Sequence, residues 1–212
     1  MFQDMKINDF TDKLSSESPV PGGGGAAALG AALAASLTAM VFNLTVGKKA
    51  FEEYDEQTKK YVLKNLQEIK DSKNEFLTFI DKDAEAFSKI IDSFKLPKNT
   101  DEEKKIRSRK IQEGYKFAAE VPMELGKKSN SIYQIIDVAI KYGNKNVISD
   151  AGAAAIFNHS VIEIAVLNIA INLSGIKDEA LKGTLKKLSQ DMLNYSQEKK
   201  DSILKNVYKQ IY

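Results

Sequence analysis

The sequence contains no cysteine and only one histidine, His159, among its 212 residues. The lack of cysteine excludes disulfides, thiolate zinc sites and a cysteine nucleophile. A single histidine excludes a metal site with two histidine ligands from the same chain. Any chemistry must therefore come from carboxylates, lysine, tyrosine, hydroxyls, amides or backbone groups.

An excess of charge of either sign is also missing. Lys and Arg number 31 and Asp and Glu number 29, which leaves a formal net charge of +2. Nucleic-acid proteins usually carry a clustered basic excess, so we expect no nucleic-acid partner. Residues 1–10 carry charges at Asp4, Lys6 and Asp9, and no apolar run follows directly, which is unlike a signal peptide. We expect a cytoplasmic protein with a single domain over residues 1–212.

One long segment, residues 22–47, has no charged residue at all. Its length would cross a bilayer. It consists largely of Ala and Gly, however, and Ala is close to neutral for membrane insertion, whereas Leu and Phe drive it. A buried helix of a soluble protein is favoured over a membrane span, although a small membrane-associated helical protein remains an alternative.

Helical patterns dominate the chain, and no run of alternating β-branched residues bounded by turn residues predicts a strand. Thr100 with Glu103 forms a capping-box pattern, Pro122 predicts a kink, and Ser149 is a potential N-cap. We expect an all-α, up-and-down helical bundle with long helices. Its expected helices span residues 5–14, 26–46, 51–94, 100–142, 150–174 and 178–212.

The helices over residues 26–46 and 150–174 have too few charges to form a solvated face. Leu29, Leu33, Leu37 and further large residues follow at steps of three and four in the first of them, opposite a face of Ala. Surplus apolar surface on a helix usually belongs to a subunit contact. We therefore expect a homodimer, or a larger homo-oligomer, that assembles through its apolar helices.

Four glycines, Gly22–Gly25, precede the first apolar helix. Backbone N–H groups at a helix start attract anions or carbonyl oxygens, and glycine allows close approach. Neither a P-loop nor a dinucleotide-binding glycine pattern fits the sequence. A ligand-contacting loop is favoured over a flexible turn.

Asp83 lies on the apolar seam of the helix expected over residues 51–94, among Phe76, Ile80 and Phe87. A carboxylate is costly there unless it is paired or used, and burial would raise its pKa towards the range useful for acid–base catalysis. The equally weighted alternative is a structural ion pair, for example with Lys73.

Three further features can be explained by structural roles alone. Asp150, near Asn144 and Asn146, suits plain N-terminal capping. His159 is interpreted as a hydrogen-bonded structural residue. Lys48 and Lys49 could complement a helix dipole or bind an anionic substrate tail.

Five motifs follow one another along the chain. Residues 18–25, S-P-V-P-G-G-G-G, run into the Ala-rich helix and are followed by N-L-T-V-G-K-K at 43–49. Later motifs are D-A-E-A-F at 83–87, G-N-K-N-V-I-S-D-A-G at 143–152, and the stretch 168–178 with its N-x-x-I-N-L pattern. In this order they resemble the motifs of the cyclodeaminase/cyclohydrolase family. The resemblance covers nearly the whole chain, and the ordered set is far more specific than the glycine run alone.

This resemblance implies a dimer that binds a tetrahydrofolate derivative in a groove, with no metal and no cofactor beyond that substrate. The implied reaction is hydrolysis of 5,10-methenyltetrahydrofolate to 10-formyltetrahydrofolate, or ammonia release from 5-formiminotetrahydrofolate. No formiminotransferase-like part is present in this sequence, which favours the cyclohydrolase. A non-enzymatic helical interaction protein is the remaining alternative. The implied catalytic residues are Asp83 and Asp150, and the implied substrate-binding residues are Pro21, Gly22, Gly23, Gly24, Gly25, Lys48, Lys49, Asn144, Asn146 and Ser149.

Overall fold

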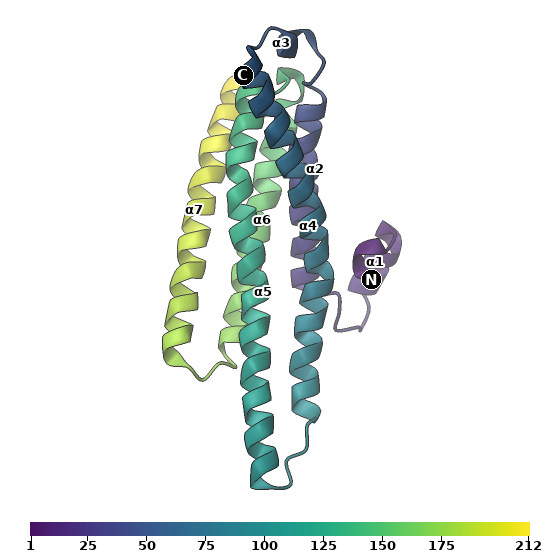
Figure 1. Ribbon diagram of the computed structural model, residues 1–212, viewed down its shortest axis with the longest axis vertical. Coiled ribbons are helices and arrows are strands. Elements are labelled where there is room, and N and C mark those ends of the chain that lie inside the picture. The colour runs from purple at the N-terminus through teal and green to yellow at the C-terminus, as the bar shows by residue number, and fades with distance from the viewer.

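The computed structural model describes all 212 residues and contains α-helices and two short 3₁₀ turns but no strand. Five long helices lie lengthwise beside one another, while α1 lies to one side (Figure 1). The predicted all-α bundle is confirmed. The elements are η1 (Phe2–Asp4), α1 (Ile7–Leu14), α2 (Gly23–Asn43), α3 (Lys49–Glu52), α4 (Glu56–Lys95), α5 (Asp101–Tyr142), η2 (Lys145–Val147), α6 (Ile148–Leu173) and α7 (Glu179–Ile211).

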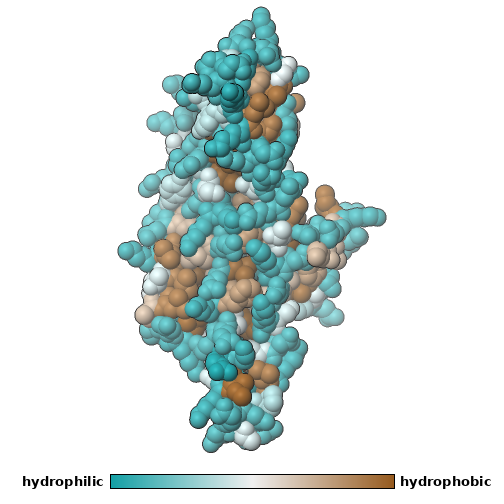
Figure 2. Space-filling model, viewed as in Figure 1, coloured by the Kyte–Doolittle hydropathy of each residue, from teal (hydrophilic) through white to brown (hydrophobic).

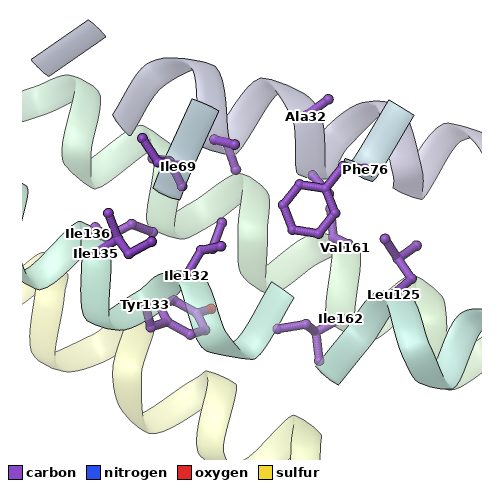
Figure 3. Packing of buried hydrophobic residues seen from close by; sticks show 14 of the residues in the cluster. Ala32, Ile69, Phe76, Leu125, Ile132, Tyr133, Ile135, Ile136, Val161 and Ile162 are labelled. Carbon is purple, nitrogen blue, oxygen red and sulfur yellow. The ribbon is translucent and has the colours of Figure 1, made fainter. Parts of the chain in front are cut away.

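The alanine face of α2 packs into the bundle against α4 and α6. Ala28, Ala31 and Ala35 are fully buried, because a methyl side chain lets neighbouring helices approach closely. Side chains from α2, α4, α5 and α6 converge in the core, where the large rings of Phe76 and Tyr133 are buried (Figure 3). Helix α7 packs mainly against α6 and to a lesser extent against α5.

The prediction of a single helix over residues 51–94 is wrong, because non-helical residues separate α3 from α4. The Asp55 side chain accepts a hydrogen bond from the Thr58 backbone N–H at 2.7 Å and so caps the start of α4. This cap satisfies an N–H group that the preceding turn of a continuous helix would otherwise bond. The predicted capping box of Thr100 and Glu103 at the start of α5 is confirmed, and α5 continues through Pro122.

The predicted cap at Ser149 is also wrong. Helix α6 begins at Ile148, directly after η2, and has no side-chain cap. Asn144 caps η2, because its side-chain oxygen accepts from the Asn146 N–H at 3.0 Å. Helix α6 follows η2 directly and so begins two residues earlier than the predicted start at residue 150.

Large apolar side chains point outward from α2 and α6, which lie behind α4 and α5 in the view of Figure 1. The face shown in Figure 2, formed largely by the other helices, is mostly hydrophilic with separate apolar patches. Both α2 and the segment Lys145–Leu173 are long and apolar enough to cross a membrane, but the buried core helices of soluble proteins meet the same criterion. The exposed large apolar residues on α2 and α6 are Leu33, Met40, Ile156, Phe157, Leu167 and Ile171.

Candidate functional site

A cavity of about 530 Å³ lies where the glycine-rich start of α2 meets α4, α5 and the last turns of α6. Its volume is in the range of pockets that bind small molecules. Its apolar wall is formed mainly by α4, with Phe87, Ile90, Ile91 and Phe94, and by Ile171 of α6. Its polar groups are Asp83, Tyr115, Asn168, Asn172 and the backbone of Gly22–Gly24.

The Asp83 side chain is held in place by the backbone of the glycine run. The Gly25 N–H, in the first turn of α2, donates to the Asp83 carboxylate at 3.0 Å. Gly24 lies so close that a Cβ atom built on it would overlap the carboxylate. Glycine at this position is therefore what allows α2 and α4 to bring a helix start and a carboxylate into contact.

Burial raises the pKa of Asp83, and the hydrogen bond from Gly25 opposes this rise. The ion pair considered with Lys73 is absent, because no cation lies within salt-bridge distance of Asp83. An unpaired, half-buried carboxylate at a cavity can stabilise a bound cation and exchange a proton with a ligand. The structure therefore favours the functional interpretation of this residue over the structural one.

Two asparagines one helical turn apart on α6 were not identified as site residues from their chemistry. Asn168 Nδ2 donates to the Ile164 carbonyl at 2.8 Å, and Asn172 Nδ2 donates to the Ala118 carbonyl at 3.0 Å. Each side chain thus donates to a carbonyl of the protein, and its oxygen is an acceptor that remains for a ligand. The signal that could have identified them is their four-residue spacing, which places both on one face of the helix.

Of the glycine-loop residues proposed from the sequence, Gly22, Gly23 and Gly24 line the cavity. Pro21 and Gly25 do not line it. Pro21 is buried and packs against Gly25, and it follows a cis Val20–Pro21 peptide bond. Pro21 therefore supports the start of α2 by packing, and Gly25 contributes to the site through the N–H that it donates to Asp83.

The remaining predicted residues lie at the opposite end of the bundle. Asn144 donates from its backbone N–H to Thr45 Oγ1 at 2.8 Å and from its side chain to the Leu44 carbonyl, just after the end of α2. The 21 residues of α2 separate that end from the glycine run by about 30 Å. One chain therefore does not bring the two groups together, and both can contact one ligand only across a subunit contact. The residues at this far end are Lys48, Lys49, Asn144, Asn146, Ser149 and Asp150.

His159 lies outside the cavity, between α6 and α7. Its Nδ1 lies 2.9 Å from the Ser196 hydroxyl, which also hydrogen-bonds the Tyr133 hydroxyl at 2.8 Å. Burial lowers the pKa of His159 and raises that of Tyr133 to about 12. Both groups are thus neutral hydrogen-bonding residues near pH 7, as the structural interpretation of His159 predicted.

Comparisons with known proteins point to one family. Residues 6–191 match the family described as formiminotransferase-cyclodeaminase. The chain is 41% identical over 175 residues to a methenyltetrahydrofolate cyclohydrolase of Methylorubrum extorquens, covering 82% of each protein. It is 33% identical to the formimidoyltransferase-cyclodeaminase of Gallus gallus and spans about a third (32%) of that protein's length. It also superposes on the crystal structure of a formiminotetrahydrofolate cyclodeaminase from Thermotoga maritima, with a TM-score of 0.79, 26% identity and coverage of 99% and 97%.

Proposed function

From the premise that this chain belongs to the formiminotransferase-cyclodeaminase family, we propose that it is a folate one-carbon enzyme that hydrolyses 5,10-methenyltetrahydrofolate to 10-formyltetrahydrofolate. The observation that carries the proposal is the unpaired Asp83 carboxylate, held by the Gly25 N–H at the cavity. The relative that is 41% identical over most of both chains is named for this reaction.

The chemistry of the cavity fits a methenyltetrahydrofolate. The substrate is a cation whose positive charge is shared between two nitrogens and the carbon between them. An unpaired carboxylate in a partly apolar pocket stabilises such a delocalised cation without a metal or redox partner. The asparagine oxygens of Asn168 and Asn172 can accept from the amino and ring N–H groups of the pterin, and the apolar wall can cover its aromatic part.

In the proposed reaction Asp83 moves one proton. Its ionised carboxylate accepts a proton from water as the water oxygen bonds to the bridging carbon, which becomes tetrahedral and neutral. Asp83 then gives this proton to N5 as the bond between the carbon and N5 breaks. The new hydroxyl loses its proton to solvent and becomes the formyl oxygen on N10, so the net products are 10-formyltetrahydrofolate and one proton. The raised pKa of Asp83 suits a group that must both accept and return a proton.

Ammonia release from 5-formiminotetrahydrofolate is the second candidate. It passes through the same kind of tetrahedral carbon between two nitrogens, and the superposable Thermotoga maritima protein bears the name of this reaction. The same carboxylate would protonate the departing ammonia. Measuring absorbance with each of the two substrates separates the two activities.

The test of the proposed role is Asp83→Asn, which keeps the shape of the side chain and removes its charge. We expect turnover of methenyltetrahydrofolate to fall by roughly a hundredfold or more, the scale of general acid–base catalysis. Glu85→Gln is the matched control, because Glu85 lies two residues away on α4 and forms only an exposed ion pair with Lys89. A folded Asp83→Asn protein with wild-type turnover would refute the assignment.

The proposal includes a cytoplasmic homo-oligomer that has no nucleic-acid or membrane partner. It is supported by the outward apolar side chains of α2 and α6, which a second copy would cover. An antiparallel second copy would also bring its Lys48, Lys49 and Asp150 towards the glycine run of the first. The roles proposed for these far-end residues depend on that arrangement.

A further inference from the structure

Helix α5 contains a proline in its interior, where proline is the least favourable residue. Pro122 lies in the middle of the 42 residues of this helix and is buried. Proline has no backbone N–H, so residue 122 cannot donate the usual helical hydrogen bond to the carbonyl of residue 118, four positions earlier. The Ala118 carbonyl therefore lacks the partner that an uninterrupted helix would supply.

A side chain of α6 takes the place of the missing donor. Asn172 Nδ2 donates to the Ala118 carbonyl at 3.0 Å, and so forms a hydrogen bond between the two helices. Ala118 and Asn172 both line the candidate active-site cavity. The carbonyl that Pro122 leaves unbonded in α5 thus lies where a residue of the cavity uses it.

Two hydrogen bonds determine which way the Asn172 amide points. Besides the bond to Ala118, Nδ2 donates to the Asn168 carbonyl at 2.8 Å. Both partners are carbonyl oxygens, which only accept, so a reversed amide would place oxygen against oxygen. The Asn172 side-chain oxygen is therefore turned away from these carbonyls, and no hydrogen bond within the chain involves it. Towards a ligand in the cavity, Asn172 is an acceptor.

The other asparagine of the cavity is held differently. Asn168 Nδ2 donates to the Ile164 carbonyl at 2.8 Å, one turn earlier in its own helix. The bond from Asn172 to the Asn168 carbonyl is of this same kind. Only Asn172 has an additional bond to a second helix, and that bond depends on the carbonyl that Pro122 leaves unbonded.

We propose that Pro122 is a positioning residue of the active site, which acts through the Ala118 carbonyl to hold Asn172 as the acceptor for an N–H group of the bound folate. The inference rests on the proposed function. An N–H at residue 122 would compete with Asn172 for the Ala118 carbonyl. The amide of Asn172 would then rotate more freely and would present its oxygen to the ligand for only part of the time.

The test restores the missing N–H with Pro122→Ala. Val121→Ala is the matched control, because it also removes two carbon atoms from a buried position of α5 but leaves every backbone donor in place. Binding is measured as the Kd for 5-formyltetrahydrofolate, which lacks the reactive cation, so that no turnover is needed. A thermal melt of each variant reports its stability.

We expect Pro122→Ala to bind this folate about three- to tenfold more weakly than the wild type, the scale of one hydrogen bond. Val121→Ala should bind it as the wild type does. Pro122→Ala should nevertheless melt at a higher temperature than Val121→Ala, because alanine is much more favourable than proline in a helix. In turnover, the loss in Pro122→Ala should fall on KM more than on kcat, because the acceptor binds a part of the substrate that does not react.

A double-mutant cycle separates this path from a general effect on α5. Asn172→Ala removes the side chain that Pro122 positions, so Pro122→Ala should weaken folate binding no further in that background. Hydrogen exchange gives a readout without ligand. The Asn172 side-chain N–H signals, identified by their loss in Asn172→Ala, should exchange with water faster in Pro122→Ala than in the wild type.

Several outcomes would overturn the inference and leave the proposed function intact. These are wild-type folate binding by Pro122→Ala, losses that multiply in the double variant, and unchanged exchange of the Asn172 side chain. A Pro122→Ala protein that melts below Val121→Ala would do the same, because the proline would then serve the stability of α5 itself. Absence of any folate binding by the wild type would overturn the proposed function together with this inference.

Discussion

Replacing Gly24 with alanine should disable the site with one methyl group. A Cβ atom at residue 24 would overlap the Asp83 carboxylate, and this side chain cannot move far without losing the hydrogen bond from Gly25. Either the carboxylate rotates away or the start of α2 shifts from α4. In both cases the reacting group leaves its position.

The magnitude follows from three opposing contributions. Alanine favours a helix by up to about 1 kcal/mol over glycine. Overpacking costs about 1–3 kcal/mol, and a lost hydrogen bond to a charged group costs about 1.5–3 kcal/mol. Because only one of the last two costs applies fully, we expect a net destabilisation of about 0–2 kcal/mol. A displacement of the reacting group by about 1 Å should lower kcat/KM by roughly a hundredfold.

The assay is the decrease in methenyltetrahydrofolate absorbance together with a thermal melt of each variant. Gly183→Ala is the control, because no atom lies within 4 Å of a Cβ at that helical position and only the helix propensity changes. We expect the control to melt at the same or a higher temperature with unchanged activity. Wild-type kcat/KM in Gly24→Ala would refute the reasoning that the spacing at Gly24 positions the carboxylate.

Three further predictions concern Asp83 and the exposed apolar face of α2. Burial raises the pKa of Asp83, which must be ionised to act as the base. After correction for the uncatalysed rate, kcat/KM should therefore rise with pH, with an apparent pKa above that of an ordinary carboxyl group. This rise should be absent in Asp83→Asn. The pKa of Asp83 is higher in the folded than in the unfolded protein, so its ionisation lowers the stability of the fold as pH rises between these two pKa values. Asp83→Asn should therefore melt no lower than the wild type at pH 7–8, and any advantage should disappear in acid. A clearly lower melting temperature of the variant at pH 8 would contradict this. Leu33→Lys puts a charge on the exposed apolar face of α2 and should reduce the native mass in light scattering, whereas Lys186→Gln should not.

Much of the fold was predictable because apolar seams and charged faces are set by residues that lie close together in the sequence. The long helices and the capping box at Thr100 depend on spacings of three and four residues, which the sequence displays directly. The break before Asp55 was missed because neither proline nor glycine interrupts the segment from Phe51 to Val62. An Asp–Thr cap competes with helix continuation by only about 1 kcal/mol, so packing decides between the two.

The site was predictable only where one residue carries the signal. A carboxylate on an apolar seam identified Asp83, and four consecutive glycines identified the site at the start of α2, although Gly23–Gly25 form its first turn and not the predicted loop before it. The spacing of Asn168 and Asn172 places both on one face of α6, but the alignment of α5 and α6 with α4 decides that this face and Tyr115 reach the cavity, and no local pattern encodes that alignment. The chemistry of the far-end residues suits a ligand, which is why they were predicted to share a site with the glycine run. Within one chain, however, the length of α2 separates them from that run. These residues are Lys48, Lys49, Asn144, Asn146, Ser149 and Asp150.

The position of Asp83 and its raised pKa have a single structural cause. The glycine run lets the start of α2 approach α4 closely enough to bury the carboxylate, which raises the pKa, and also presents the Gly25 N–H that holds it and limits this rise. A substitution that widens this contact would admit water, lower the pKa and release the side chain together. The acid–base property and the geometry of this site therefore cannot be tuned separately at residues 24 and 25, so variants at these positions should show a shifted pH profile wherever they show reduced turnover.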